Sequence, residues 1–140
     1  MLIQFFLSDT KITLKEKARL KLFIAGIFRK KQRKLSSLSF VFCSDQRILE
    51  INKAHLKHDY YTDIITFDLA DPGNPVEGEV YISADRIRDN AEIQQVTLKQ
   101  EIHRVIFHGV LHLCDYKDKS ARDKKKMTAE EDRLLRLYFS

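Results

Sequence analysis

Segments with strand-like and helix-like sequence alternate along this chain, and the alternation limits the folds that it can adopt. Short β-rich runs occur at residues 2–7, 38–43, 63–69 and 79–82. Between and after them, apolar residues recur at the three- and four-residue spacing of amphipathic helices. The predicted order is therefore βαβαββααα. This order is typical of an α/β (α+β) fold, with a small mixed β-sheet of about four strands covered by helices.

Capping patterns predict where the helices begin. Ser/Thr-x-x-Glu/Gln boxes start at Thr13, Thr97 and Thr128, and Ser44 (or Asp45) and Ser83 are further candidate caps. In the helix after Thr13 the expected buried positions are Leu14, Ala18, Leu22 and Ala25, and in the helix after Ser83 they are Ile87, Ala91 and Ile93.

The length of 140 residues fits one domain, 1–140, with a core that needs no disulfide or structural metal. The two cysteines, Cys43 and Cys114, are too few to form a disulfide framework. The cluster of proline, glycine and other turn-forming residues at 71–75 predicts a turn between two strands. Residues 1–7 lack the features of a secretion signal, and no apolar run approaches the ~18–20 residues of a membrane span. We therefore expect a cytoplasmic protein without a membrane partner.

The formal charge of +5 is concentrated in two basic runs. One is Arg29-Lys30-Lys31-Gln32-Arg33-Lys34, and the other comprises Lys117, Lys119, Arg122, Lys124, Lys125 and Lys126. The charge is consistent with a polyanionic partner. Each run taken alone is typical of a solvated helix end or loop.

The main candidate for chemistry is a histidine pair on the most apolar predicted helix. His108 and His112 are four residues apart, so both imidazoles project from one face and can bind one metal ion. Asp118 follows after a short polar stretch that can turn back and offer a third ligand. Two histidines and a carboxylate leave a position open for water, as in catalytic zinc sites.

The residue after His108 argues against peptidase chemistry. In the H-E-x-x-H helix of zinc proteases that residue is the glutamate general base, and here it is Gly109. The same ligand set occurs in non-haem iron oxygenases. Their ligands usually come from a β-barrel, which this sequence does not indicate.

The residues around this pair resemble a known family. His108-Gly109-Val110-Leu111-His112-Leu113, with Tyr116 and Asp118, is similar to the H-G-x-L-H-L-x-G-Y-D-H signature of the YbeY endoribonucleases. The resemblance extends over roughly residues 38–118. Asn52, Asp59 and residues 62–67 match the family's L-N-x-x-Y-R-x-K-D-x-P-T-D-V-L-S-F block, and residues 78–83 match its G-D-I strand.

The resemblance implies a zinc-dependent endoribonuclease specific for single-stranded RNA, acting in 16S rRNA 3′-end maturation and ribosome quality control. It implies one Zn²⁺ per chain on His108, His112 and Asp118, and the small ribosomal subunit as partner. Expected RNA contacts are Lys57, His58, Lys117, Lys124, Lys125 and Lys126.

Three positions depart from the family pattern. Asp118 replaces the last histidine, Asp115 replaces a turn glycine, and Leu56 aligns with an arginine thought to assist the chemistry. Asp adopts left-handed backbone more readily than most residues, so Asp115 is tolerable. The arginine's role stays unassigned.

For the other candidate residues we expect roles outside the catalytic step. Asp63 is expected to be a strand-edge or capping residue, Glu101 to support the helix or a metal ligand, and Cys43 to be a buried apolar residue. His55, His58 and His103 are expected at the surface. Two alternatives stay open: a metalloprotease-like hydrolase with a zincin-like helix, and a non-catalytic ribosome-associated RNA-binding factor with a structural metal.

Overall fold

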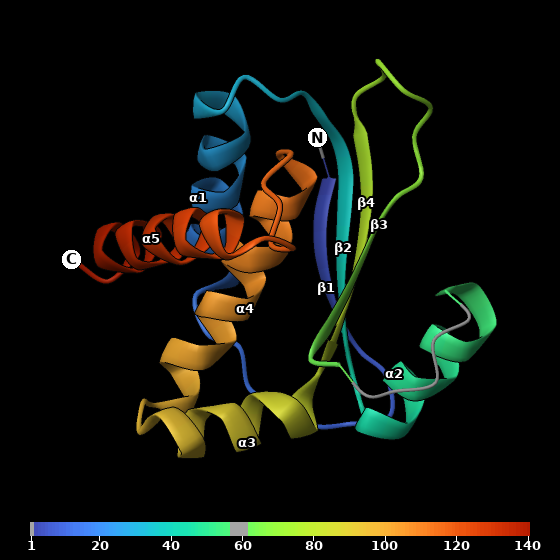
Figure 1. The fold of residues 1–140 in the computed structure, drawn as a ribbon, viewed down its shortest axis with the longest axis vertical. Helices are drawn as coiled ribbons and strands as arrows, with labels where there is room; N and C mark the ends of the chain where they lie inside the picture. Colours follow the sequence, from blue (N-terminus) through green and yellow to red (C-terminus); the bar gives the residue numbers. More distant parts are fainter. Residues whose placement is uncertain (1, 57–61) are drawn as a thin grey trace.

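A computed structural model describes residues 2–56 and 62–140 of the chain (Figure 1). Its elements are β1 (Leu2–Leu7), α1 (Lys17–Lys30), β2 (Leu35–Cys43), α2 (Asp45–Ile51), a π-helical turn η1 (Asn52–Leu56), β3 (Ile64–Asp68), β4 (Val76–Ser83), α3 (Ala84–Gln94), α4 (Leu98–Leu113) and α5 (Ala121–Tyr138). The predicted order of strands and helices is confirmed.

The four strands form one mixed sheet in the order β1-β2-β4-β3. β1, β2 and β4 run parallel, whereas β3 pairs with β4 in the antiparallel sense. The predicted α+β class with a four-stranded mixed sheet is therefore confirmed.

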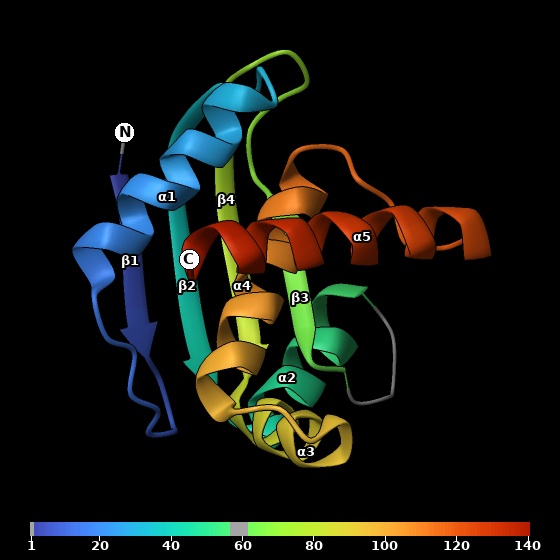
Figure 2. The same ribbon diagram turned by 90° about the vertical axis from the view of Figure 1, so that its left-hand side faces the viewer.

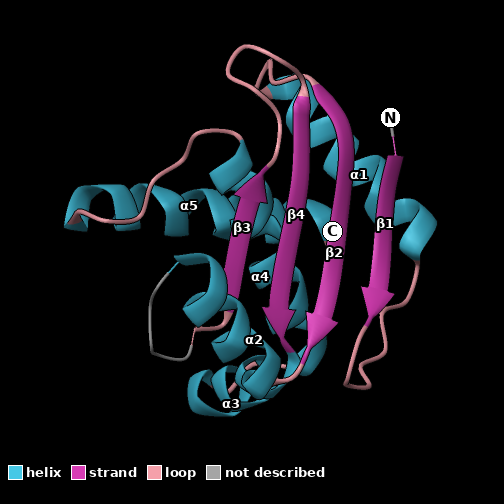
Figure 3. Ribbon diagram, turned by 90° about the vertical axis from the view of Figure 1, so that its right-hand side faces the viewer, coloured by secondary structure: helices cyan, strands magenta, loops and turns pink. Residues whose placement is uncertain are grey.

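The helices cover the two faces of the sheet unequally. α1, α4 and α5 lie on one face (Figure 2), whereas α2 lies on the other, over one end of the sheet (Figure 3). The strands show this asymmetry directly: Leu38, Phe40 and Phe42 of β2 are buried in the main core, while Ser37 and Ser39 point the other way. A smaller core of Cys43, Ile48, Ile51 and Ile65 lies under α2.

A glycine lets α4 lie close to the sheet. A Cβ atom at Gly109 would be 3.1 Å from both Ile64 Cδ1 and Val80 Cγ1. The helix therefore contacts β3 and β4 through its backbone at the point between the two histidines.

The start and the buried face of α1 differ from the prediction. The helix begins at Lys17, and Glu16 precedes it in left-handed backbone without a side-chain cap, so the Thr13 box is wrong. The buried stripe is Leu20, Ile24, Ile27 and Phe28, and Leu22 is 76% exposed. Two stripes compete on this helix, and the bulkier one removes more apolar area from water.

Two further expectations on helix faces and ends are wrong. Ile93 of α3 is 78% exposed, because helical spacing places it on the face opposite the buried residues Ala84, Ile87 and Ala91. The Thr128 box lies inside α5, which begins at Ala121 with the Ser120 hydroxyl accepting from the Asp123 amide at 3.0 Å. The first turns of α5 are charged and lack apolar periodicity, so the sequence pattern did not indicate where the helix begins. Caps at Ser44, Ser83 and Thr97 are confirmed.

In the described part of the chain, no helix has the length and apolar character needed to cross a bilayer.

Candidate metal centre

The end of α4 turns the chain back beneath the helix. The Tyr116 amide donates to the Leu111 carbonyl at 2.9 Å and the Asp115 amide donates to the His112 carbonyl at 3.0 Å, which together form a Schellman motif. Asp115 takes the left-handed position with φ 71°. The aspartate thus fills the conformational role of the family's glycine, and the motif aims Asp118 at the helix face that carries the histidines.

Three donor groups meet at this turn. Asp118 Oδ2 is 3.3 Å from His108 Nε2 and 3.3 Å from His112 Nε2. All three ligand atoms lie within 4.8 Å of one another, and each residue is partly buried. His108, His112 and Asp118 therefore form a cluster that could hold a metal ion.

The other ring nitrogen of each histidine faces an acceptor. His108 Nδ1 is 2.5 Å from Glu131 Oε2, and His112 Nδ1 is 3.0 Å from the Tyr116 carbonyl oxygen. A neutral imidazole that donates from Nδ1 carries its lone pair on Nε2. Both Nε2 lone pairs are thereby directed toward Asp118, in the arrangement that metal-ligating histidines commonly have.

This donor set fits a tetrahedral metal ion. Zinc binds imidazole nitrogen and carboxylate oxygen at about 2.0–2.2 Å, which at a tetrahedral angle separates neighbouring donors by ~3.3–3.6 Å. The two nitrogen–oxygen distances of 3.3 Å agree with that separation. With three protein ligands, one position remains for water or substrate.

Glu131 of α5 connects His108 to a buried ion-pair network. Its side chain is 8% exposed, and its Oε1 accepts from Arg104 Nη1 at 2.9 Å. Burial alone would lower the pKa of His108. The hydrogen bond to Glu131 and the negative charges of Glu131, Asp63 and Asp118 outweigh burial, and they raise that pKa. The acidic groups around His108 therefore favour positive charge at that imidazole.

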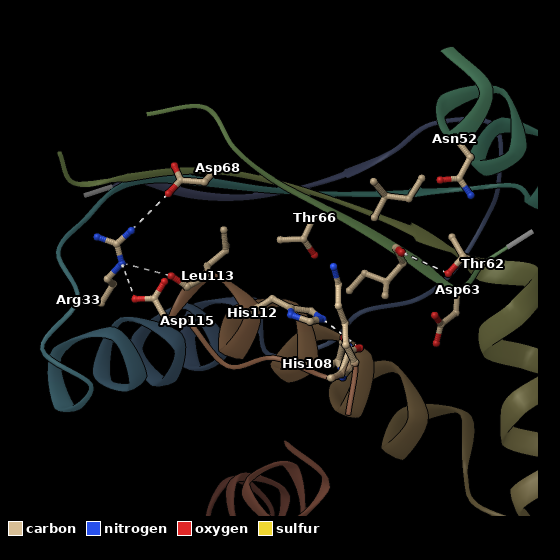
Figure 4. Close-up of a pocket in the computed structure, with 14 residues that line it drawn as sticks. Arg33, Asn52, Thr62, Asp63, Thr66, Asp68, His108, His112, Leu113 and Asp115 are labelled. Carbon is tan, nitrogen blue, oxygen red and sulfur yellow. Dashed lines mark hydrogen bonds and ion pairs between the residues drawn. The ribbon is translucent and has the colours of Figure 1, made fainter. Parts of the chain in front are cut away.

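The cluster opens into a cleft of about 830 Å³. Figure 4 shows Arg33, Asp68 and Asp115 at one end, Thr62 and Asp63 at the other, and the histidines between them. Asn52, Thr66 and Lys119 also line the cleft. A phosphodiester chain reaching the histidines would therefore pass several carboxylates.

The predicted RNA-contact residues separate into two groups. Lys117, Lys124, Lys125 and Lys126 are exposed, on the turn after α4 and in the first turns of α5. Lys57 and His58 lie outside the described residues, as does Asp59. Leu56 ends η1 immediately before them.

Among the remaining candidates, the expectation for His103 is wrong. It is 2% exposed and stacks on Tyr138 at 5.1 Å, because α5 covers that side of α4. His55 is exposed and Cys43 is buried, as expected. Burial raises the pKa of the Cys114 thiol to about 11, which keeps it protonated.

Two carboxylates flank the cluster. Asp63 lies just before β3, where its carbonyl accepts from the Ser83 amide at 2.9 Å, and its side chain lines the cleft. Glu101 is 3% exposed, and burial raises its pKa, with the nearby Asp63 and Glu131 adding to the shift. Glu101 therefore belongs to the acidic surroundings of His108.

Glu131 was missed by sequence reasoning, although α5 carries a signal for it. The buried residues of that helix are Met127, Glu131, Leu134, Leu135 and Tyr138. A lone carboxylate within an apolar helical stripe indicates a buried polar partner.

Comparisons with known proteins place the chain in one family. The family model described as Endoribonuclease YbeY matches residues 5–138. A relative from Cytophaga hutchinsonii, named Endoribonuclease YbeY, is 44% identical over 96% of this chain and 94% of its own length. A relative of the same name from Parabacteroides distasonis is 39% identical over the same shares.

A solved structure shows the same fold. The solution structure of a Thermotoga maritima protein aligns with a TM-score of 0.64 at 22% identity, covering 98% of this chain and 89% of the other. The family match and the two relatives confirm the resemblance seen in the histidine signature, and the chain belongs to the YbeY endoribonuclease family.

Proposed function

We propose that residues 1–140 form one catalytic domain of a zinc-dependent endoribonuclease that cleaves single-stranded RNA. Its place in the cell is the cytoplasm, where it acts on the small ribosomal subunit in 16S rRNA 3′-end maturation and ribosome quality control. The family and the names of the relatives support the reaction class.

One observation carries the metal-dependent part of the proposal. Both Nε2 atoms lie 3.3 Å from one Asp118 oxygen, while both Nδ1 atoms face acceptors that hold their protons. A histidine pair on a merely solvated face would have no reason to share this orientation.

Different residues of the chain have different roles in the site. Glu131 and the Tyr116 carbonyl fix the two imidazole planes, and Asp118 closes the donor set from the turn. When bound there, a zinc ion would supply Lewis acidity to a water molecule and to a phosphate oxygen. Arg33 and Lys119 supply positive charge at the cleft, where a phosphate must approach against several aspartates.

The RNA contacts of this proposal include exposed lysines on the turn after α4 and in the first turns of α5. They are Lys117, Lys124, Lys125 and Lys126, whose exposed side chains can meet phosphates. Lys57 and His58 remain proposed contacts as well.

Metal content and RNA cleavage measured together test this function. We expect purified protein to hold one equivalent of zinc and to cleave single-stranded RNA but not casein, with activity abolished by a chelator. His112→Ala removes one of three ligands, so bound zinc and cleavage should both be lost after dialysis against a chelator. The fold should persist, because His112 lies outside the main core.

Asp71→Ala, in the turn between β3 and β4, is the control and should retain zinc and activity. Retention of a full equivalent of zinc by His112→Ala would refute the ligand assignment. Zinc binding without RNA cleavage would indicate a structural metal, and cleavage of casein would indicate a peptidase.

A further inference from the structure

A second cavity, of about 700 Å³, lies beside the end of α1. We call it the α1 groove. Three basic side chains, Arg29, Arg33 and Lys34, line it together with apolar surface from Phe28, Leu35 and Pro75. Among the described residues that line it, none is acidic. The α1 groove thus differs in charge from the metal cleft, which is lined by Asp63, Asp68, Asp115 and Asp118.

Two cations of the α1 groove have no carboxylate partner among the described residues. Arg33 pairs with Asp68 at 3.4 Å and Asp115 at 3.8 Å. Within residues 2–56 and 62–140, neither Arg29 nor Lys34 has a carboxylate within 4.0 Å. Their charge is therefore available to a ligand.

The backbone that carries these cations is fixed. The Arg33 amide donates to the Phe28 carbonyl at 2.9 Å, and the Gln32 amide donates to the Arg29 carbonyl at 3.1 Å. The Lys34 carbonyl accepts from the Val76 amide at 2.9 Å, which ties the run to β4. A fixed backbone lowers the entropy lost when side chains above it bind a ligand.

Arg33 joins the α1 groove to the metal cleft, because its side chain lines both cavities. A strand held at the cluster can leave the acidic cleft past Arg33 and enter a groove that has no acidic side chain among its described lining residues. Single-stranded nucleic acid is bound by basic grooves that follow its phosphates. The charge of the α1 groove and the lining residue that it shares with the metal cleft both point to the same ligand.

We propose that the α1 groove binds the phosphate backbone of single-stranded RNA where it extends from the metal cleft, through Arg29 and Lys34. This inference rests on the proposed endoribonuclease function, which supplies the RNA. It assigns a role to a basic run that by sequence alone is typical of a solvated helix end.

The test compares two double variants of equal charge. Arg29→Gln with Lys34→Gln removes the unpaired cations of the α1 groove. Lys15→Gln with Lys17→Gln removes two exposed lysines from the opposite end of α1. Both are measured as zinc-loaded protein, with a labelled phosphorothioate RNA that keeps its backbone charge and resists hydrolysis. Its length of about 20 nucleotides exceeds the ~4–16 nucleotides of a typical single-strand site.

The readout is the slope of log affinity against log salt concentration. Each phosphate contact contributes ~0.7 to this slope for single strands, so the groove variant should lower it by about 1.4. The Lys15/Lys17 control should leave the slope unchanged, and zinc content should be the same in all three proteins.

Equal slopes for the wild type and the groove variant would overturn the inference, and so would an equal loss in the control. If the groove variant loses binding of an oligoglutamate peptide while its RNA slope stays the same, the groove is a protein-docking surface and the proposal is wrong. Cleavage of ordinary RNA by the wild type is assayed in parallel. Absence of cleavage contradicts the proposed function, whereas the salt slopes alone decide the α1 groove.

Discussion

The ends of α1 and α4 have the same backbone motif and opposite chemistry. Each closes with a Schellman motif whose left-handed residue is not glycine: Gln32 with φ 57° in α1 and Asp115 with φ 71° in α4. Cations precede and follow the first, and metal-ligand candidates precede and follow the second. The turn determines the direction of the chain, while the residues beside it determine what the helix end can bind.

The two helix ends also contact each other and share one support. Arg33 Nε donates to the Leu113 carbonyl at 3.4 Å, and Lys31 Nζ donates to the Tyr116 hydroxyl at 2.8 Å. α5 contributes a glutamate to each end, Glu130 to Lys31 and Glu131 to His108. The basic end and the metal end are therefore held at a fixed spacing.

The largest effect is expected from a variant that tests whether metal binding at the α4 end depends on α5. Glu131→Gln keeps an acceptor for His108 Nδ1 and removes the negative charge. Loss of such a partner typically lowers metal affinity by about 10–100-fold. Titration of zinc against a competing chelator measures this.

Asp132→Asn is the matched control, because Asp132 also pairs with Arg104, at 2.5 Å, without a hydrogen bond or ion pair to His108. Its zinc affinity should equal that of the wild type. An unchanged affinity in Glu131→Gln would mean that the α4 end holds its ligands without help from α5.

A smaller effect tests whether the α1 end depends on α5 for stability. Hydrogen bonds from Arg133 and from Lys31 lower the pKa of Glu130 to about 2, against the opposing effect of burial. A lowered folded-state pKa stabilises the protein above the unfolded value of 4.5, and this stability is lost as the pH falls toward 2.

Glu130→Gln should therefore cost ~1–2 kcal/mol of unfolding free energy at neutral pH, discounted because Arg133 is partly exposed. It should also weaken the acid dependence between about pH 4.5 and 2. Urea unfolding across this range measures both. Glu50→Gln removes an exposed pair at the same i,i+3 spacing as Glu130–Arg133 and should cost less than ~0.5 kcal/mol. Equal costs for the two variants would contradict the coupling of α1 to α5.

The smallest effect is expected from glycine substitutions at the two left-handed residues, which compare their effects on stability. Gln32→Gly relieves left-handed strain and should stabilise the protein by about 0.5–1 kcal/mol. Asp115→Gly should gain less, because Asp tolerates this conformation better and its side chain pairs with Arg33. Thermal unfolding of both variants gives the order, and a larger gain at position 115 would contradict it.

The sequence predicted those features that depend on residues close together in the chain. The His108–His112 pair could be predicted because helical spacing alone places i and i+4 side chains together, and Asp118 followed from a short turn. The strands were recognisable because one face of the sheet is buried, which imposes alternation on β2. The buried face of α1 was mistaken because two apolar stripes compete there, and only tertiary packing selects between them.

The partners that complete the site come from elsewhere in the chain. Glu131 is 23 residues from His108, and it reaches the imidazole only because α5 packs across α4. The α1 groove needs Pro75 beside the end of α1, which depends on β4 pairing with β2. His103 was expected at the surface because Tyr138, which covers it in the structure, is 35 residues away in the sequence.

The close packing at Gly109 has a consequence for how this family can evolve. A zinc peptidase would require a glutamate there, and the space beside that Cα is already filled by Ile64 and Val80. A lineage that acquired the glutamate would need Ile64 or Val80 to yield by a few tenths of an ångström, in the layer that packs α4 against β3 and β4. Introducing a base at that turn would therefore disturb the packing between the helix that carries both histidines and the sheet.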